Sequence, residues 1–360
     1  MKRSLVISPE APWPMLGGGQ LRTVSLFEYL RSKGEVDAIV FHADPLPGEY
    51  ANVLHIDLPY HSRSIPAKLW RNGVRWLKQV PPLVDRFSGY ETRIAEWLRD
   101  RHYDLALFEH FWVAPYLDTV RPHAARCALD LHNIESVWLK RMRLPFADCA
   151  RRLEDRWLPK FDAILTASAH DSAQIPVRSF IYPNAIPVQE TPLTVREANV
   201  VAMSGNFEFP PNAQGARWLA REVMPQLSGV ELRWIGKHSE RMPFGSATGT
   251  IPDAIEELAK ATVAAVPIFA GSGTRLKIIE AWAAGTPVIS TTVGCEGLDC
   301  RDGRELLIRD TPQSFAAAIR ELLASPGERA KLAEEGRKRY LSDFTWTAAW
   351  KRLENCRALY

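Results

Sequence analysis

Short apolar runs alternate with longer amphipathic segments along most of this 360-residue chain. The alternation predicts an α/β fold with mostly parallel sheets, because a helix must carry the chain back across the sheet between parallel strands. We expect strands at 4–8, 36–42, 103–108, 126–131, 161–166, 178–182, 199–204, 230–236, 247–250, 262–267 and 287–290. We expect helices at 19–33, 64–79, 91–101, 134–158, 169–174, 212–227, 253–260, 274–284, 312–324, 327–340 and 344–358.

A proline-rich, polar stretch at 182–194 interrupts this pattern and indicates a linker. The length fits two domains, and the alternation restarts after the linker. We therefore expect two doubly wound, Rossmann-like domains that face each other across a cleft, with boundaries at 1–184 and 185–343 and a closing helical segment at 344–360. In such sheets ligands bind at the carboxyl ends of the strands.

Composition excludes several other classes. The net charge of +3 argues against nucleic acid as a partner, and the chain holds no apolar run of the roughly 18 residues that a membrane span requires. The first apolar run stops at Pro9, too early for a signal peptide, so we expect a strand there. The five cysteines show no paired ligand spacing, which indicates free thiols, a cytoplasmic protein and no zinc site.

The segment 271–290 carries the clearest functional signal, since it has a glycine-rich loop, one helix, a glycine stop and an apolar strand. Free backbone N–H groups at the helix start suit a phosphate. Arg275 and Lys277 place positive charge where the helix dipole disfavours it, unless an anion binds nearby. Glu280 could accept hydrogen bonds from a hydroxyl pair. We predict a nucleotide-phosphate site; the alternative is an ordinary structural unit with solvated charges.

Together with 201–207 and 253–267, this segment resembles the carboxyl-terminal half of a family 4 (group 1) glycosyltransferase, and 344–350 is similar to that family's closing helix. The resemblance is specific over about 200–345 and looser before 185, where the matching pieces are 17–20 and 130–135. It implies the GT-B fold, a nucleotide-sugar donor on the second domain, an acceptor on the first, and a last helix that crosses back to the first domain.

Two departures from the family pattern concern the donor. The usual motif is Glu, seven residues, Glu; the second falls on Glu280, but the first falls on Ser272, which leaves the identity of the sugar open. The loop that follows the strand ending at 204 begins with Gly205 and carries no cation where relatives often have Arg and Lys. Arg275 and Lys277 are expected to supply that charge. Lys237 is a third candidate, with a solvated loop lysine as the alternative.

The resemblance implies hexosyl transfer with retention, in which the leaving phosphate takes the acceptor proton. Backbone N–H groups at 273–275, together with Arg275 and Lys277, would then stabilise the charge that develops on the diphosphate. Gly271, Ser272, Gly273 and Thr274 are expected to bind the donor. We expect a UDP-sugar donor, no other cofactor and no metal, because the protein supplies the cations and the donor half has no clear Asp-x-Asp pair.

On the acceptor side, Gly17, Gly18 and Gly19 follow the first strand and permit close approach of a ligand; the alternative is a flexible turn. His132 ends an apolar strand, and the family match implies contact with the donor sugar, although a lone histidine is often structural. Glu109 and His110 end another strand, and there the site and structural interpretations stay open.

Residues 61–80 contain five cations and no acid, interleaved with Trp70, Trp76 and Leu77. A basic helix with tryptophan favours an anionic membrane surface; the alternative is a solvated face with its tryptophans in the core. The membrane interpretation predicts peripheral attachment at the inner face and a lipid-linked acceptor, as in surface-glycan assembly. Two other functions remain open: a nucleotide-sugar epimerase or phosphorylase of the same fold, or a catalytically silent sugar-nucleotide binding subunit.

Overall fold

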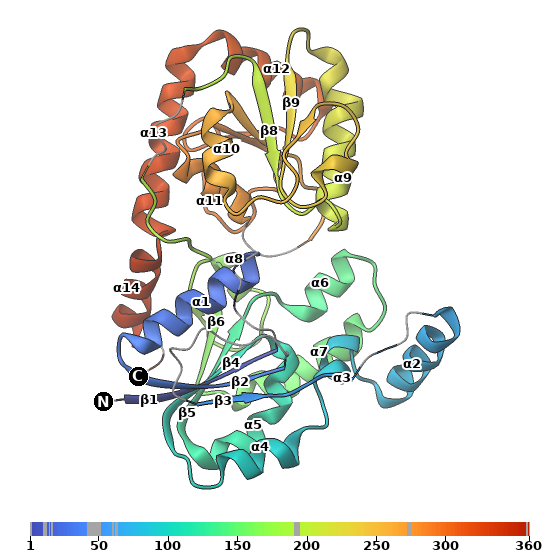
Figure 1. The fold of residues 1–360 in the computed structure, drawn as a ribbon, viewed down its shortest axis with the longest axis vertical. Coiled ribbons are helices and arrows are strands. Elements are labelled where there is room, and N and C mark those ends of the chain that lie inside the picture. Colours follow the sequence, from blue (N-terminus) through green and yellow to red (C-terminus); the bar gives the residue numbers. More distant parts are fainter. Residues whose placement is uncertain are drawn as a thin grey trace. The chain divides into compact units, whose positions relative to one another are not determined.

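A computed structural model describes residues 2–9, 13, 15, 17–41, 52–59, 61, 64–190, 195–271, 275–357 and 359. The chain forms two compact units. The first comprises Met1–Pro183 and Trp350–Tyr360, and the second comprises Asn184–Ala349. Each unit is built on its own parallel sheet, so the α/β prediction is confirmed (Figure 1).

The sheet of the first unit has the strand order β3-β2-β1-β4-β5-β6-β7, and all its pairs are parallel. The strands are β1 Lys2–Ser8, β2 Gly34–Val40, β3 Val53–His55, β4 Tyr103–Glu109, β5 Ala124–Leu131, β6 Ala163–Thr166 and β7 Phe180–Ile181. The central strands are buried over most of their length, as expected for a sheet covered on both faces.

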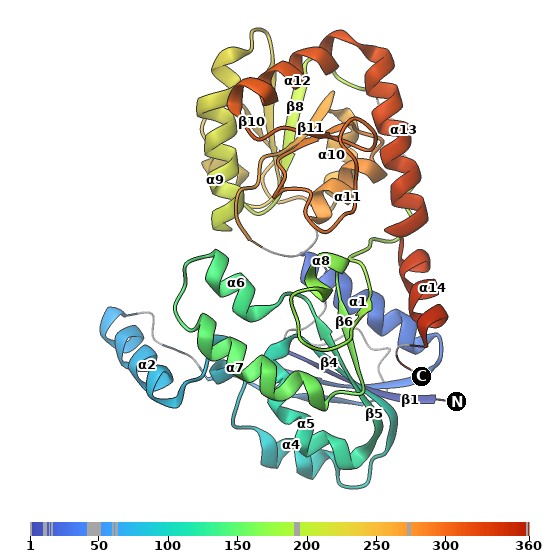
Figure 2. The same cartoon turned by 180° about the vertical axis from the view of Figure 1, so that it is seen from behind.

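The helices between these strands are α1 Gly18–Arg31, α2 Ile65–Lys78, α3 Pro82–Arg86, α4 Glu91–Leu98, α5 Leu117–Val120, α6 Glu135–Arg141, α7 Ala147–Trp157 and α8 Ala169–Ser172. Short 3-10 turns lie at Phe111–Tyr116, Arg121–His123 and Leu158–Lys160. The two opposite views show α1 on one face of the sheet and α4 and α5 on the other (Figure 1, Figure 2). Right-handed crossovers that leave β1 and β4 in opposite directions produce this arrangement.

The sheet of the second unit has the order β10-β9-β8-β11-β12-β13, again with parallel pairs. Its strands are β8 Val200–Ser204, β9 Glu231–Ile235, β10 Ser246–Ala247, β11 Val263–Val266, β12 Val288–Ser290 and β13 Leu307–Ile308. Its helices are α9 Pro210–Trp218, α10 Ala254–Lys260, α11 Leu276–Ala283, α12 Pro312–Ala324 and α13 Pro326–Asp343, and α14 Trp346–Cys356 closes the chain. From Trp350 onward α14 belongs to the first unit, where the Trp350 indole donates a hydrogen bond to the Ser25 carbonyl.

Two expected helices differ from the structure, one in its extent and one only in its type of helical turn. The stretch 134–158 forms α6 and α7 rather than one helix, because Pro145 lacks a backbone donor and Arg143 and Phe146 adopt positive φ angles of 53° and 75°. The stretch 212–227 continues α9 as a π-helical turn at Leu219–Val223 and a 3-10 turn at Met224–Gln226.

The proline-rich stretch expected as a linker is packed in most of its described part. Tyr182, in the first unit, is buried, as are Ala185 and Ile186 in the second. Ile186 pairs with Thr345 as an isolated bridge, and the Tyr340 hydroxyl donates to the Pro187 carbonyl. Tertiary contacts hold this proline-containing segment in place. Its composition alone therefore predicted a more flexible segment than the structure shows.

Candidate functional site

In the second unit the candidate residues lie at the switch point of the sheet. The connections that follow β8 and β11 leave these neighbouring strands in opposite directions, and open parallel sheets bind ligands at the carboxyl ends of such strands. Gly205 directly follows β8. The loop from Pro267 to Arg275 follows β11 and leads into α11. The sequence therefore placed its phosphate motif at the position that the topology favours.

Lys277 connects these two loops. Its Nζ donates to the Ser204 carbonyl at 2.9 Å and to Asn212 Oδ1 at 2.7 Å. Gly205 has a φ of 146°, and a Cβ there would lie 3.0 Å from Lys277 Nζ and 2.8 Å from Asn212 Nδ2. Glycine is thus required both by the backbone and by the close approach of the lysine. Removal from water, together with the charge of Arg275, lowers the pKa of Lys277 to about 7.

Arg275 and Glu280 flank Lys277. Arg275 is the N-cap residue of α11, and its Nη2 lies 3.4 Å from the position of a Cβ on Gly271. Glu280 lies one turn beyond Lys277 on the same helix and is partly exposed. Burial raises the pKa of its carboxyl to about 7 against the opposing charge of Lys277. The three loop residues Ser272, Gly273 and Thr274 lie outside the described residues.

Lys237 contributes through its backbone. Its carbonyl accepts a hydrogen bond of 2.9 Å from the Phe207 amide, which fixes the loop after Gly205. Its side chain is exposed. The sequence interpretation named Gly205, Arg275 and Lys277, but it missed Ser204 and Asn212, because a carbonyl and an amide give no motif signal.

In the first unit the candidate residues also gather at a switch point, here between β1 and β4. Glu109, the last residue of β4, lies opposite Asp130 of β5 in the strand register, and His132 directly follows β5. His132 Nε2 lies 2.7 Å from Glu109 Oε2 and 3.3 Å from Asp130 Oδ2. All three side chains are buried.

Arg22 of α1 completes this cluster, and the sequence interpretation did not include it. Its Nε donates to Asp130 Oδ2 at 2.7 Å, while Nη2 donates to Asp130 Oδ1 and Nη1 to the Tyr182 carbonyl. Its guanidinium also stacks on the Tyr182 ring, 4.7 Å from the ring centroid. Burial by itself would raise the pKa of Asp130, but the charge and hydrogen bonds of Arg22 and His132 lower it, so Asp130 is ionised.

His110 packs on one face of His132. The ring centroids are 3.6 Å apart, and Trp112 stacks on the other face of His110 at 4.3 Å. His110 has a φ of 65°, which is uncommon for a residue other than glycine and often marks a functional position. Burial, reinforced by the charge of His132, lowers the pKa of His110 well below its usual value, so this ring is neutral.

The predicted glycine loop meets the same cluster. Gly17 is the N-cap of α1 and offers no side-chain cap, and Gly18 begins the helix. A Cβ on Gly19 would lie 3.5 Å from His132 Nδ1. The structure therefore brings Gly19, Glu109, His110 and His132 together, at a helix start where backbone N–H groups are available.

Glu109, Asp130 and His132 also have the chemistry of metal ligands, with one donor atom from each lying within 4.8 Å of the others. Arg22, however, already occupies both oxygens of Asp130. The short nitrogen–oxygen distances are those of hydrogen bonds. The three side chains therefore form a hydrogen-bonded cluster with Arg22.

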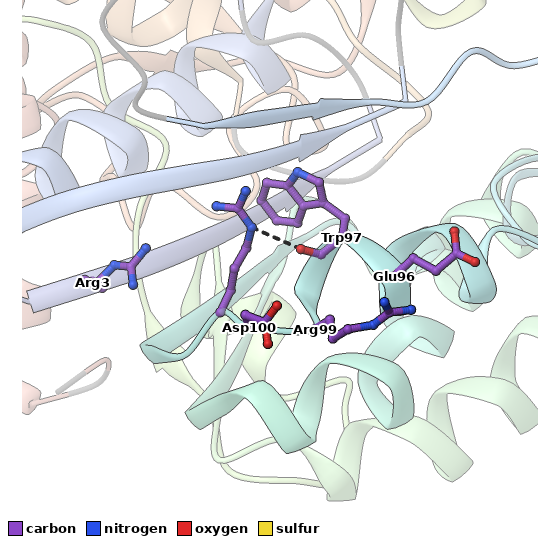
Figure 3. Close-up of a pocket in the computed structure, with 6 residues that line it drawn as sticks. Arg3, Glu96, Trp97, Arg99 and Asp100 are labelled. Carbon is purple, nitrogen blue, oxygen red and sulfur yellow. Dashed lines mark hydrogen bonds between the residues drawn. The ribbon is translucent and has the colours of Figure 1, made fainter.

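A hollow of about 430 Å³ lies elsewhere in the first unit (Figure 3). It is lined by Arg3, Glu96, Trp97, Arg99, Asp100 and Arg101. Arg3 lies near the amino end of β1, whereas the clusters above lie at carboxyl ends of strands. The hollow includes none of the candidate residues. In the described part of the chain, moreover, no helix has both the length and the hydropathy needed to cross a bilayer.

Comparison with known proteins shows which family the second unit resembles. Residues 198–325 match the family described as Glycosyl transferases group 1. The chain is 25% identical to an uncharacterized 44.6 kDa protein in the cps region of Klebsiella pneumoniae, over 89% of this chain and 90% of that protein. A shorter segment is 35% identical to the lipopolysaccharide core biosynthesis glycosyltransferase LpsE of Rhizobium meliloti, over 23% of this chain and 26% of that one.

Among solved structures, Anabaena Alr3699/HepE in complex with UDP and glucose has a similar fold, with a TM-score of 0.70 and 14% identity over 99% of both chains. This likeness extends over both units, whereas the family match lies in the second. Both findings agree with the resemblance found in the sequence: residues 198–325 match the group 1 (family 4) glycosyltransferases, and the chain as a whole has the GT-B fold.

Proposed function

We propose that the protein is a retaining hexosyltransferase that moves a sugar from a UDP-sugar to a glycan or lipid-linked acceptor in surface polysaccharide or glycolipid synthesis. The observation that carries the proposal is Lys277, held beside Gly205 at the switch point of the second sheet. The cps-region and lipopolysaccharide-core relatives support the pathway class, and the structural neighbour with UDP and glucose supports the donor.

The chemistry requires positive charge where the diphosphate departs. Lys277 and Arg275 would stabilise the charge that develops there, as would the N–H groups at the start of α11. Lys277 is only partly protonated near pH 7, and a bound dianion would favour its charged form. In this proposal the protein supplies the cations, so the reaction proceeds without a metal.

The remaining roles follow from position. Glu280, on the same helix as Lys277, would hold the ribose hydroxyls of the donor. Lys237 is a third candidate cation for the phosphates. His132 would contact the transferred sugar. The glycine loop 17–19 would leave room for a ligand.

The test is a thermal-shift screen of nucleotide sugars, followed by product analysis with the donor that binds. We expect UDP and one UDP-sugar to raise the melting temperature, because a ligand stabilises the state that it binds. We also expect a product with a new glycosidic bond of retained configuration. An epimerised nucleotide sugar or a sugar phosphate would instead indicate the epimerase or phosphorylase. Binding without turnover on any acceptor would indicate a silent binding subunit.

The proposal includes attachment to the cytoplasmic face of a membrane through α2. Ile65, Leu69, Trp70, Trp76 and Leu77 are all more than 60% exposed, with Trp70 at 75% and Trp76 at 65%. At 100° per residue these side chains share one side of the helix. The opposite side packs on the protein through Arg75, whose Nε lies 2.8 Å from Asp85 Oδ2. The helix therefore turns its apolar stripe to solvent, contrary to the alternative with tryptophans in the core.

An anionic bilayer fits this surface by charge. Lys68 and Lys78 are exposed beside the stripe, and α2 contains no acidic residue. Both views show α2 standing away from the sheet of the first unit (Figure 1, Figure 2). An apolar stripe with flanking lysines is typical of helices that lie in the membrane interface.

Vesicle sedimentation tests this attachment. The wild type should bind vesicles that contain phosphatidylglycerol, and should bind less at high salt because charge attraction is screened. Replacing Trp70 and Trp76 by serine should abolish binding. The matched control is Phe244→Ser, which removes an equally exposed apolar side chain from the second unit. Equal binding to neutral vesicles, or self-association through α2 without vesicle binding, would contradict the anionic-membrane interpretation.

A further inference from the structure

The position of Glu109 is unusual for a charged residue. Its side chain is fully buried, and its Oε2 accepts a hydrogen bond of 3.0 Å from Thr23 Oγ1 in addition to facing His132. Its Oε1 is buried with no hydrogen-bond partner in the described part of the chain. Burying a carboxylate oxygen without a partner is costly. Because Glu109 has no access to solvent, it does not reach an acceptor directly, so a role must pass through its neighbours.

The charges of the cluster show which neighbour matters. Arg22 and Asp130 form a buried ion pair, and His132 lies against both Asp130 and Glu109. Burial raises the pKa of Glu109, and its hydrogen bond to His132 opposes that rise, so the charge of Glu109 depends on His132. His132 Nε2 faces oxygens of both carboxylates, so Nε2 carries a proton. Burial by itself would lower the pKa of His132, but its hydrogen bonds to Asp130 and Glu109 outweigh burial and raise it.

The groups around His132 leave only the Nδ1 side of its ring available to a ligand. His110, from the segment after β4, covers one ring face and is neutral. Arg22, from α1, donates to both oxygens of Asp130. The second ring nitrogen, Nδ1, faces Gly19 in the first turn of α1. A protonated ring held in this way therefore directs a charged N–H donor toward the glycine loop.

We propose that Glu109 is a positioning residue that holds His132 as an imidazolium and directs its Nδ1–H toward the first turn of α1, where it donates to the substrate. The inference rests on the proposed function and changes the role of Glu109 from acceptor contact to support of His132. The positive charge of Arg22 balances Asp130 and keeps it ionised. The negative charge of Glu109 is then the one that balances a protonated His132. The covalent chemistry of transfer is unchanged, since no proton leaves the imidazolium.

The test is the titration of His132 followed by NMR in histidine-labelled protein, with its signal among the nine histidines assigned through His132→Ala. In the wild type we expect His132 to stay protonated through neutral pH. In Glu109→Gln, which keeps the shape and removes the charge, we expect it to titrate at lower pH. The kcat of this variant should fall about tenfold for each pH unit above the new pKa and recover on acidification, with the donor KM unchanged.

Glu154→Gln is the matched control. Glu154 is another buried carboxylate of the first unit, and its two oxygens accept hydrogen bonds from the Ser136 amide and hydroxyl. It should lose stability without moving the His132 titration or the pH profile of kcat. This separates a loss of packing from a change at His132.

Three results would overturn the inference: a neutral His132 at pH 7 in the wild type, an unchanged titration in Glu109→Gln, or a shifted titration with an unchanged pH profile. The first needs no variant, so it decides even if Glu109→Gln fails to fold. A wild type that binds no UDP would count against the proposed function. The titrations would still decide whether Glu109 sets the charge of His132.

Discussion

The binding of UDP should depend on pH through Lys277. In the free protein this lysine has a pKa of about 7, because it is removed from water and lies near Arg275. A diphosphate at the start of α11 would favour the charged lysine, so binding takes up a proton wherever the free lysine is neutral. From pH 7.0 to 8.5 the protonated fraction falls from about one half to about 3%. The affinity for UDP should therefore fall about 16-fold, or about 1.6 kcal/mol.

Calorimetric titration with UDP at both pH values measures this change. Phosphate esters titrate near pH 6, so the charge of UDP is nearly constant over the interval. Lys277→Met should bind UDP weakly and with almost no pH dependence. Lys277→Arg is the informative control, because a guanidinium stays charged throughout and should also remove the pH dependence while keeping more of the affinity.

The direction of the pH dependence of UDP affinity tests the role of Lys277. Only the charged lysine attracts the diphosphate, so affinity must decrease as the pH rises through 7. A wild-type affinity that is constant from pH 7.0 to 8.5 would contradict a diphosphate site beside a lysine of lowered pKa. The same slope in Lys277→Met would assign the proton to another group.

The other predictions concern single positions. Glu280→Ala should raise the donor KM more than it lowers kcat, because the ribose does not change during transfer; steady-state kinetics with the opposite pattern would remove Glu280 from that role. His132→Ala should lower kcat about tenfold or more, which corresponds to at least about 1.4 kcal/mol, and an intact kcat with reduced stability would make His132 structural. Gly205→Ala should destabilise the protein by about 1–3 kcal/mol in urea unfolding, since its φ is positive and a Cβ would press on Asn212; an unchanged midpoint would contradict this. Activity should survive a chelator, and activity that returns only with magnesium or manganese would disprove metal independence.

Much of the fold could be predicted from local sequence patterns. Parallel strands buried on both faces are continuous apolar runs, and amphipathic helices show their period within a few turns, so the alternation of elements is visible without tertiary information. The motif at 271–290 could be recognised for the same reason, because Gly271, Arg275, Lys277 and Glu280 lie close together in the sequence. The wrong extent of the expected helix 134–158 also has a local cause. Pro145 lies within this stretch, and a proline in a helix interior favours the break that the structure shows there.

The partners of the candidate residues required the tertiary structure. Arg22 and Asp130 are 108 positions apart in sequence, and Lys277 reaches Asn212 across 65. No local pattern encodes such pairs, because they arise when the topology brings the carboxyl ends of separate strands to one edge of a sheet. The sequence of α2 likewise determined which side chains share a side of the helix. Only packing decided that the Arg75 side faces the protein and that the tryptophans face solvent, because periodicity defines the faces of a helix but not which of them the rest of the chain covers.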